Sequence, residues 1–245
     1  NYFRTGFVAE GVTTYMGDVM LYNSGVFNWE QFIKTQNQNL ERHLMNYGRK
    51  NLSVADSGFD NWLDGYKLGI PNRKTSIYPD GALCMLMIDL HIIKKTNGKD
   101  SLHSVMKDMY KNFALQNKGY SEKDFRDICV HYGGAEIKNI FDNHVYNTKD
   151  YIPSLKKALE FIGLTLTPKK NPNLSAQYFG FVAMKENDKI IIRLVEPNSV
   201  ADKNNIAVGD EITLIDGEKR ENLKEYLKDC NDKVSFTIKK KFSEK

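Results

Sequence analysis

The spacing of apolar residues changes once along the chain, and this change divides the sequence into two parts. Up to about residue 166 the apolar positions recur at helical intervals. A repeat of three to four residues places apolar side chains on one face of a helix, so we predict amphipathic helices packed around one core. The first such face is formed by Val12, Met16, Val19 and Met20.

The segment from Asp80 to Lys95 is apolar on nearly all sides, which is typical of a helix surrounded by other helices. We predict that it is the central helix. Helix starts are indicated where a hydroxyl precedes a carboxylate by three residues, as in 53–56 and 121–124. A second amphipathic helix face, with Gln36 as its one polar member, is formed by Phe32, Ile33, Gln36, Leu40 and Leu44. Further helices are expected at 102–113, 125–129, 137–141 and 155–162.

A polar segment with two prolines, residues 167–173, ends the helical pattern, and we interpret it as a linker. Beyond it the apolar period becomes two, which predicts strands at 189–195, 211–215 and 233–239. The sequence therefore predicts a multidomain α and β protein. An all-helical bundle over residues 1–166 is followed by a small β-sandwich or barrel domain over residues 174–242.

Composition and charge narrow the functional classes. The chain has 245 residues, 41% apolar and 27% charged, which is typical of soluble globular proteins with one large or two modest cores. Its 35 basic and 31 acidic residues are evenly spread, so we do not expect nucleic-acid binding. The longest apolar run, residues 82–93, is interrupted by Asp89 and His91 and is shorter than the roughly 20 residues of a membrane span. We expect a soluble protein, cytoplasmic or exported.

The cysteines and histidines show no metal-binding pattern. Cys84, Cys129 and Cys230 are scattered in or beside apolar stretches, which favours buried free thiols over disulfides. The five histidines include neither an HxxxH nor an HExxH spacing. Inside the apolar central helix, Asp89 and His91 are predicted to be hydrogen-bonded core or edge residues rather than ligands.

The second part of the chain resembles a PDZ domain over residues 174–242. The resemblance rests on Tyr178-Phe179-Gly180-Phe181 and, in order after it, on residues 198–206, 208–212 and 215–217. It implies that the turn at Gly180 exposes N–H groups that hold the C-terminal carboxylate of a peptide ligand. The peptide would add a strand beside residues 181–184.

The peptide-binding groove of this domain would be completed by a helix over residues Glu221 to Cys230. Leu223 and Leu227 are the candidate side chains that face the peptide. The alternative, that both leucines pack on the sheet of their own domain, remains open.

The first part resembles the glycyl aminopeptidase family of gluzincin metallopeptidases. Residues 8–15, Val-Ala-Glu-Gly-Val-Thr-Thr-Tyr, resemble the helix that supplies the third zinc ligand in that family. The similarity continues through residues 47–50, 57–62, 76–83, 119–125 and 141–146. Because this family also carries a PDZ domain after its helical half, the two resemblances support each other.

The family resemblance implies roles for individual residues. It makes Glu10 a zinc ligand and Tyr78 the phenol that donates a hydrogen bond to the oxyanion of the tetrahedral intermediate. Thr14, one helical turn after Glu10, would orient a neighbouring ligand. Taken without the family, a glutamate here would serve the helix dipole, and Tyr78 would be a core or capping aromatic. Asp60 and Trp62 are candidates for lining the substrate cleft, with packing an equal alternative for Trp62.

These observations predict the C-terminal part of a zinc aminopeptidase that removes N-terminal residues from peptide or protein substrates. The parent protein would bind zinc through an HExxH helix upstream of residue 1. This chain, with one ligand, is expected to bind no zinc and to be inactive alone. The alternative is a non-catalytic helical scaffold with a peptide-binding PDZ module.

Overall fold

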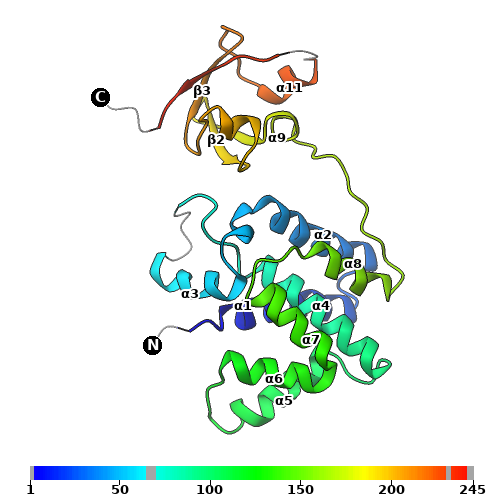
Figure 1. Ribbon diagram of the computed structural model, residues 1–245. Helices are drawn as coiled ribbons and strands as arrows, with labels where there is room; N and C mark the ends of the chain where they lie inside the picture. The colour runs from blue at the N-terminus through cyan, green and yellow to red at the C-terminus, as the bar shows by residue number, and fades with distance from the viewer. Residues whose placement is uncertain (1–2, 65–69, 230–232, 242–245) are drawn as a thin grey trace. The chain divides into compact units, whose positions relative to one another are not determined.

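The computed structural model describes residues 3–64, 70–229 and 233–241 of the chain (Figure 1). Cys230, residue 242 and the side chain of Trp62 lie outside the described residues, so what the sequence indicates for them stays a prediction. The chain divides into two compact units. We call residues 1–166 the helical unit and residues 167–245 the sheet unit.

In the described part of the helical unit, every regular element is a helix or a single helical turn. The elements are α1 (Gly6–Asn23), α2 (Trp29–Met45), η1 (Tyr47–Lys50), α3 (Val54–Asp64), α4 (Pro79–Thr96), α5 (Leu102–Met109), η2 (Tyr110–Ala114), α6 (Glu122–Gly133), α7 (Ala135–Ile140), η3 (Phe141–Val145) and α8 (Ile152–Glu160).

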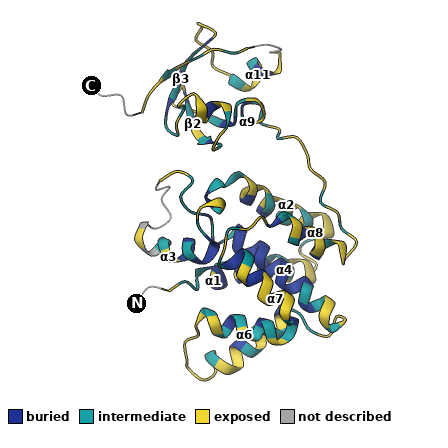
Figure 2. Ribbon diagram, viewed as in Figure 1, coloured by how far each residue is buried: buried dark blue, intermediate teal, exposed yellow. Residues whose placement is uncertain are grey.

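Helix α4 is the central helix of this unit, and its position confirms the prediction made from its apolar sequence. It packs against α1, α2, α6 and α8, and nearly all of its residues are buried from Pro79 to Ile92 (Figure 2). Phe7, Phe125 and Phe141 from three other elements meet edge to face, with ring centroids 6.2–6.5 Å apart. The core therefore forms where α1, α6 and η3 converge beside α4.

The helix starts predicted from capping residues are present. Ser121 and Asp124 form a reciprocal capping box at the start of α6, and Asp56 N–H donates to Ser53 Oγ at 3.1 Å before α3. The predicted apolar faces are correct near the helix centres and wrong near two helix ends. Met20 is 55% exposed and Leu44 is 39% exposed. Both lie in the last turns of α1 and α2.

The sheet unit contains a four-stranded antiparallel sheet with strand order β1-β2-β3-β4. Its elements are α9 (Leu174–Phe179), β1 (Phe181–Glu186), β2 (Lys189–Val195), α10 (Val200–Lys203), β3 (Glu211–Ile215), α11 (Leu223–Lys228) and β4 (Phe236–Lys239). The core of this unit contains Phe181, Ile192 and Ile215, all nearly fully buried. In the described residues the strands form one sheet, so the predicted sandwich or barrel is not seen there.

The last strand is shorter than predicted. The alternating pattern indicated residues 233–239, but β4 begins at Phe236. Ser235 N–H donates to the Asp216 carboxylate at 2.7 Å. A side chain therefore binds a main-chain N–H group that would pair with the neighbouring strand if β4 were longer. Among the described residues, no helix combines the length and the apolar character that a membrane span requires.

Candidate functional site

Helices α1 and α4 touch at two glycines, and this contact sets the position of the predicted site residues. A Cβ atom on Gly11 would lie 2.7 Å from the Gly81 carbonyl carbon, and one on Gly81 would lie 2.8 Å from the Gly11 Cα. No larger residue fits at either position without moving a backbone. Glu10 immediately precedes Gly11, and Tyr78 is the residue before α4, which contains Gly81. The contact therefore places the turn that carries Glu10 and the turn that carries Tyr78 at the crossing of α1 and α4.

Glu10 is half-buried on α1, and within the described ranges its carboxylate has no hydrogen bond or ion pair. Thr14 is also half-buried and lies one turn further along the helix. The neighbouring Thr13 instead bonds back to the helix, with its hydroxyl donating to the Ala9 carbonyl at 2.8 Å. The Glu10 carboxylate is therefore available to a group from elsewhere.

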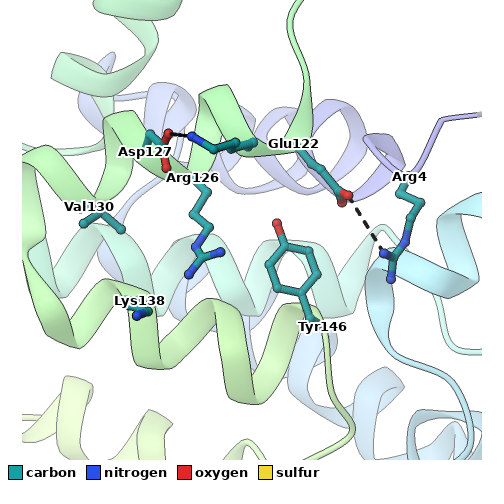
Figure 3. Close-up of a pocket in the computed structure, with 8 residues that line it drawn as sticks. Arg4, Glu122, Arg126, Asp127, Val130, Lys138 and Tyr146 are labelled. Carbon is teal, nitrogen blue, oxygen red and sulfur yellow. Dashed lines mark hydrogen bonds and ion pairs between the residues drawn. The ribbon is translucent and has the colours of Figure 1, made fainter.

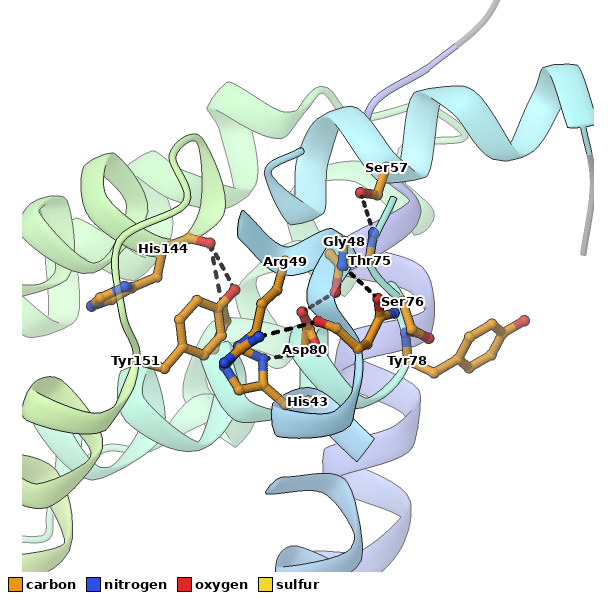
Figure 4. A network of polar contacts seen from close by, with 12 residues as sticks. His43, Gly48, Arg49, Ser57, Thr75, Ser76, Tyr78, Asp80, His144 and Tyr151 are labelled. Atoms are coloured by element: carbon orange, nitrogen blue, oxygen red, sulfur yellow. Dashed lines mark hydrogen bonds and ion pairs between the residues drawn. The ribbon is translucent and has the colours of Figure 1, made fainter. Parts of the chain in front are cut away.

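Tyr78 stands at the N-terminal end of α4, where Pro79 begins the helix. Its side chain is partly buried against the helical core. Figure 4 shows the ring directed away from Asp80 and from His43 of α2. These two side chains lie on the opposite side of the turn that carries Tyr78. The turn thus separates an outward-facing phenol from a buried polar network.

The buried network fixes the turn that carries Tyr78 (Figure 4). Thr75 donates its hydroxyl to one oxygen of Asp80, and its N–H donates to Ser57 Oγ at 3.0 Å. The other Asp80 oxygen lies 3.1 Å from Nδ1 of His43, a contact within ion-pair distance that lacks hydrogen-bond geometry. The side chains of Asp80 and His43 are each 1% exposed. The network therefore ties the start of α4 to α2 and α3.

The network continues from His43 to two residues near the end of the helical unit. The His43 ring stacks on Tyr151 with centroids 4.3 Å apart, and the Tyr151 hydroxyl donates to the His144 carbonyl at 2.8 Å. Burial raises the pKa of Tyr151, and burial also raises the pKa of Cys84, beside it, to about 12. Burial lowers the pKa of His144. Burial thus disfavours the charged form of each of these three groups.

The polar residues inside α4 are structural, as predicted. Asp89 accepts hydrogen bonds from the Tyr15 hydroxyl at 2.7 Å and from the Leu102 N–H at 2.6 Å. Burial raises the pKa of Asp89. His91 contacts the Met87 carbonyl through Nδ1 at 2.7 Å. Both side chains are used within the fold.

Two other groups of predicted residues are also engaged within the fold. Asp60 forms an ion pair with Arg73 at 2.5 Å, so its carboxylate is tied to the segment before α4. Cys84 and Cys129 are buried free thiols, in agreement with the sequence interpretation. Burial raises the pKa of Cys129 well above its ordinary value.

An open pocket of about 520 Å³ lies beside Tyr146 and the start of α6 (Figure 3). The carbon centres of the Arg4 and Arg126 guanidinium groups lie 5.8 Å and 5.9 Å from the Tyr146 ring centroid. Each guanidinium also has a carboxylate partner: Arg4 lies 2.6 Å from Asp56, and Arg126 lies 3.3 Å from Asp142. Both guanidinium groups of the pocket therefore already have carboxylate partners within the fold.

The predicted peptide-binding residues of the sheet unit are divided between a helix and the core. Gly180 adopts a left-handed turn with φ of 79°, as the sequence implied, and a Cβ there would lie 2.2 Å from the Ser199 Cβ. The Gly180 N–H itself donates to the Ala176 carbonyl at 3.1 Å, so this one donor of the turn is engaged within α9. Tyr178 and Phe179 form the last turn of α9, and Phe181 is fully buried.

The two leucines of the groove helix face inward. Leu227 on α11 is 2% exposed, and Leu223 is half-buried against the core of the sheet unit. Both also line a cavity of about 240 Å³ together with Ala183 of β1. Both leucines therefore pack within their own domain, which is the alternative that the sequence left open. The cavity beside them leaves room for contact with a ligand.

The described residues contain no group of three His, Cys, Asp or Glu side chains that could hold a metal ion. The Glu10 carboxylate is a suitable zinc donor by type, but a catalytic zinc site in a protein has three ligands. The described residues alone therefore do not complete a zinc site.

Together these features define a two-unit protein in which a helical unit presents a free carboxylate and a phenol near one crossing, and a sheet unit has a small groove. Residues 1–84 match the family model of M61 glycyl aminopeptidase, and residues 154–239 match that of the PDZ domain. Both resemblances predicted from the sequence are confirmed. The PDZ match begins within α8, before the sheet unit.

A solved structure with a similar fold is an aminopeptidase N family protein from Idiomarina loihiensis. The TM-score is 0.85 and the sequence identity is 22%, over 97% of this chain and 43% of that chain. The chain thus spans less than half the length of that protein. Comparison with curated proteins gives no match.

Proposed function

We propose that this chain is the C-terminal part of a zinc aminopeptidase that removes N-terminal residues from peptides. The observation that carries the proposal is the backbone contact between Gly11 and Gly81, which brings the turns of Glu10 and Tyr78 to one helix crossing. The match to the glycyl aminopeptidase family over residues 1–84 supports it, because it includes both residues. The similar fold of an aminopeptidase N family protein agrees with it.

In this proposal each residue acts according to its chemistry. Glu10 supplies one carboxylate to a zinc ion whose other ligands come from segments outside this chain. When bound, the ion would supply Lewis-acid chemistry for polarising the scissile carbonyl and activating water. Tyr78 donates its phenol proton in a hydrogen bond to the developing oxyanion without bringing a charge into the ground state. Thr14 orients a group near Glu10. This chain alone is proposed to be inactive, because a single zinc ligand, Glu10, is not enough to hold the metal ion.

The parent protein, expressed from its complete gene, gives the test with glycyl and alanyl substrates. Glu10→Gln should abolish hydrolysis, and Tyr78→Phe should lower kcat by about 100-fold or more, because it removes an oxyanion donor. Tyr110→Phe is the matched control, because this tyrosine is 58% exposed, and it should leave kcat unchanged. Full activity in the Tyr78 variant would remove the phenol from the mechanism.

We also propose that the sheet unit binds a peptide, since it matches the PDZ domain and has a groove beside β1. The alternative function is a helical scaffold with this peptide-binding module and no catalysis. The match to the PDZ domain over residues 154–239 supports the binding module of this alternative. The complete gene distinguishes the two, because a parent protein without an HExxH helix would support the scaffold.

A further inference from the structure

The phenol of Tyr78 is carried by a segment that has no regular secondary structure of its own. Residues 74–76 belong to no helix or strand, and Tyr78 is the residue before α4. We call residues 73–78 the entry segment. Inside a helix, repeating main-chain hydrogen bonds fix the position of each residue. The entry segment lacks this pattern, so the position of Tyr78 depends on the contacts that hold the segment.

The beginning of the entry segment is held by η1 and α3. A Cβ atom on Gly48 of η1 would lie 2.1 Å from the Lys74 carbonyl oxygen, so the two main chains are in contact. Arg73 is paired with Asp60 of α3 at 2.5 Å. Both contacts lie at least four residues before Tyr78, so the conformation nearer the phenol requires a further contact.

A hydrogen bond between two side chains closes the entry segment around Tyr78. The hydroxyl of Thr75 donates to Oδ2 of Asp80, so the bond joins a residue before Tyr78 to one after it. Thr75 is 5% exposed, and Asp80 is fully buried. A hydrogen bond in such surroundings is electrostatically stronger than one in water. This bond therefore constrains the backbone that carries the phenol.

Asp80 is itself held in place, so it offers Thr75 a fixed acceptor. Its Oδ1 lies 3.1 Å from Nδ1 of His43, and the His43 ring stacks on Tyr151 with centroids 4.3 Å apart. The Tyr78 ring points away from both Asp80 and His43 (Figure 4). Asp80 therefore influences the phenol through the backbone rather than by side-chain contact.

We infer that Thr75 and Asp80 are positioning residues for Tyr78, because their hydrogen bond holds the entry segment in the conformation that presents the phenol at the crossing of α1 and α4. The inference rests on the proposed function and deepens it, since it adds two residues that have no chemical role of their own. A misplacement of about 1 Å can lower a rate by about 100-fold. Loss of the bond should therefore slow the chemical step although the phenol is still present.

The test uses the parent protein, expressed from its complete gene, with a glycyl substrate. Thr75→Val removes the hydroxyl, keeps a similar shape and leaves the main-chain bond from Thr75 N–H to Ser57 Oγ in place. We expect kcat to fall by about tenfold or more and KM to stay within about twofold, because the phenol acts mainly in the transition state. Thr75→Ser restores a hydroxyl donor and should return kcat to within about threefold of the unmodified value.

Thr96→Val is the matched control, at the opposite end of α4. The Thr96 hydroxyl donates to the Ile92 carbonyl at 2.9 Å, so this variant also loses a threonine hydrogen bond and should leave kcat unchanged. Thr75→Ala lacks the hydroxyl as well and carries the test if the valine variant does not fold. Circular dichroism gives the folded fraction, and kcat is expressed per folded molecule. Equal losses in the serine and valine variants would assign the effect to packing and overturn the inference.

A double variant, Thr75→Val with Tyr78→Phe, separates positioning from an independent effect. If Thr75 acts through Tyr78, the double variant should have the kcat of Tyr78→Phe alone, since no phenol hydroxyl remains to be positioned. Losses that multiply would show that Thr75 acts independently of the phenol and would overturn the inference.

The inference and the proposed function fail in different ways. Full activity of Tyr78→Phe, or an inactive parent protein, would refute the proposed function and the inference with it. A large loss in Tyr78→Phe together with normal kcat in Thr75→Val would refute the inference alone.

Discussion

The contact between Gly11 and Gly81 makes a quantitative prediction about two glycines of one helix. Replacing glycine by alanine inside a helix stabilises it by about 1 kcal/mol where space allows. Gly17 lies in α1 with no atom within 4 Å of an added Cβ, so Gly17→Ala should raise the free energy of unfolding by about that amount. It serves as the matched control for Gly11, which lies in the same helix.

Gly11→Ala should have the opposite effect. Its Cβ would lie 2.7 Å from backbone carbon and 3.0 Å from backbone oxygen of Gly81, and a backbone cannot rotate aside as a side chain can. Overpacking of this kind costs about 1–3 kcal/mol. The two variants should therefore differ by about 2–4 kcal/mol in their free energies of unfolding, with the Gly11 variant the less stable.

Urea unfolding followed by tryptophan fluorescence measures this difference in the relevant part of the chain. Both tryptophans, Trp29 and Trp62, belong to the helical unit, so the signal reports on that unit. If the Gly11 variant were as stable as the Gly17 variant, the two helices would not be in backbone contact. The proposed crossing of the Glu10 and Tyr78 turns would then lose its basis.

Two further predictions concern the buried network and its pH dependence. Asp80→Ala should lower the free energy of unfolding by about 3–5 kcal/mol, because His43 and Thr75 lose their buried partner; a urea titration in which stability is unchanged would contradict this. Burial lowers the pKa of His144, so below its ordinary value of 6.5 the unfolded chain binds more protons than the folded one. Stability should therefore fall as the pH drops below about 6.5, and His144→Gln should flatten this dependence; an equal slope in the variant would contradict the assignment.

Much of the helical architecture could be predicted because its signals are local. The apolar sequence of α4 identified the central helix, and Ser121 with Asp124 identified the start of α6. Exposure at the helix ends could not be read in the same way. Met20 continues the apolar face of α1, but its exposure depends on where the rest of the core stops.

The polar network is the part of the candidate site that the sequence did not reveal. His43 and Asp80 lie on different helices, and no spacing along the chain relates them. An aspartate in the first turn of an otherwise apolar helix was the one signal of it, because such a buried carboxylate requires a partner. The roles of Glu10, Tyr78 and Thr14 remain predictions that rest on the family resemblance.

The loop before β1 shows how a correct local feature can lead to a wrong detail. Gly180 was expected to form a turn, and it does so with a positive φ. Its N–H is nevertheless consumed by α9, because the residues before it continue as a helix. The sequence motif located the turn at Gly180. Whether its N–H group was available depended on the hydrogen bonds of the helix before it, which the motif does not specify.

The structure of the two edge strands of the sheet also affects self-association. An uncovered edge strand is a template on which another copy can pair and start aggregation. On one edge the Ser175 hydroxyl already occupies the Phe181 carbonyl. On the other, β4 is only four residues long and ends at Lys239, whose charge repels the same edge of a second molecule. Each feature disfavours edge-to-edge pairing with a second copy at its own position along the edge.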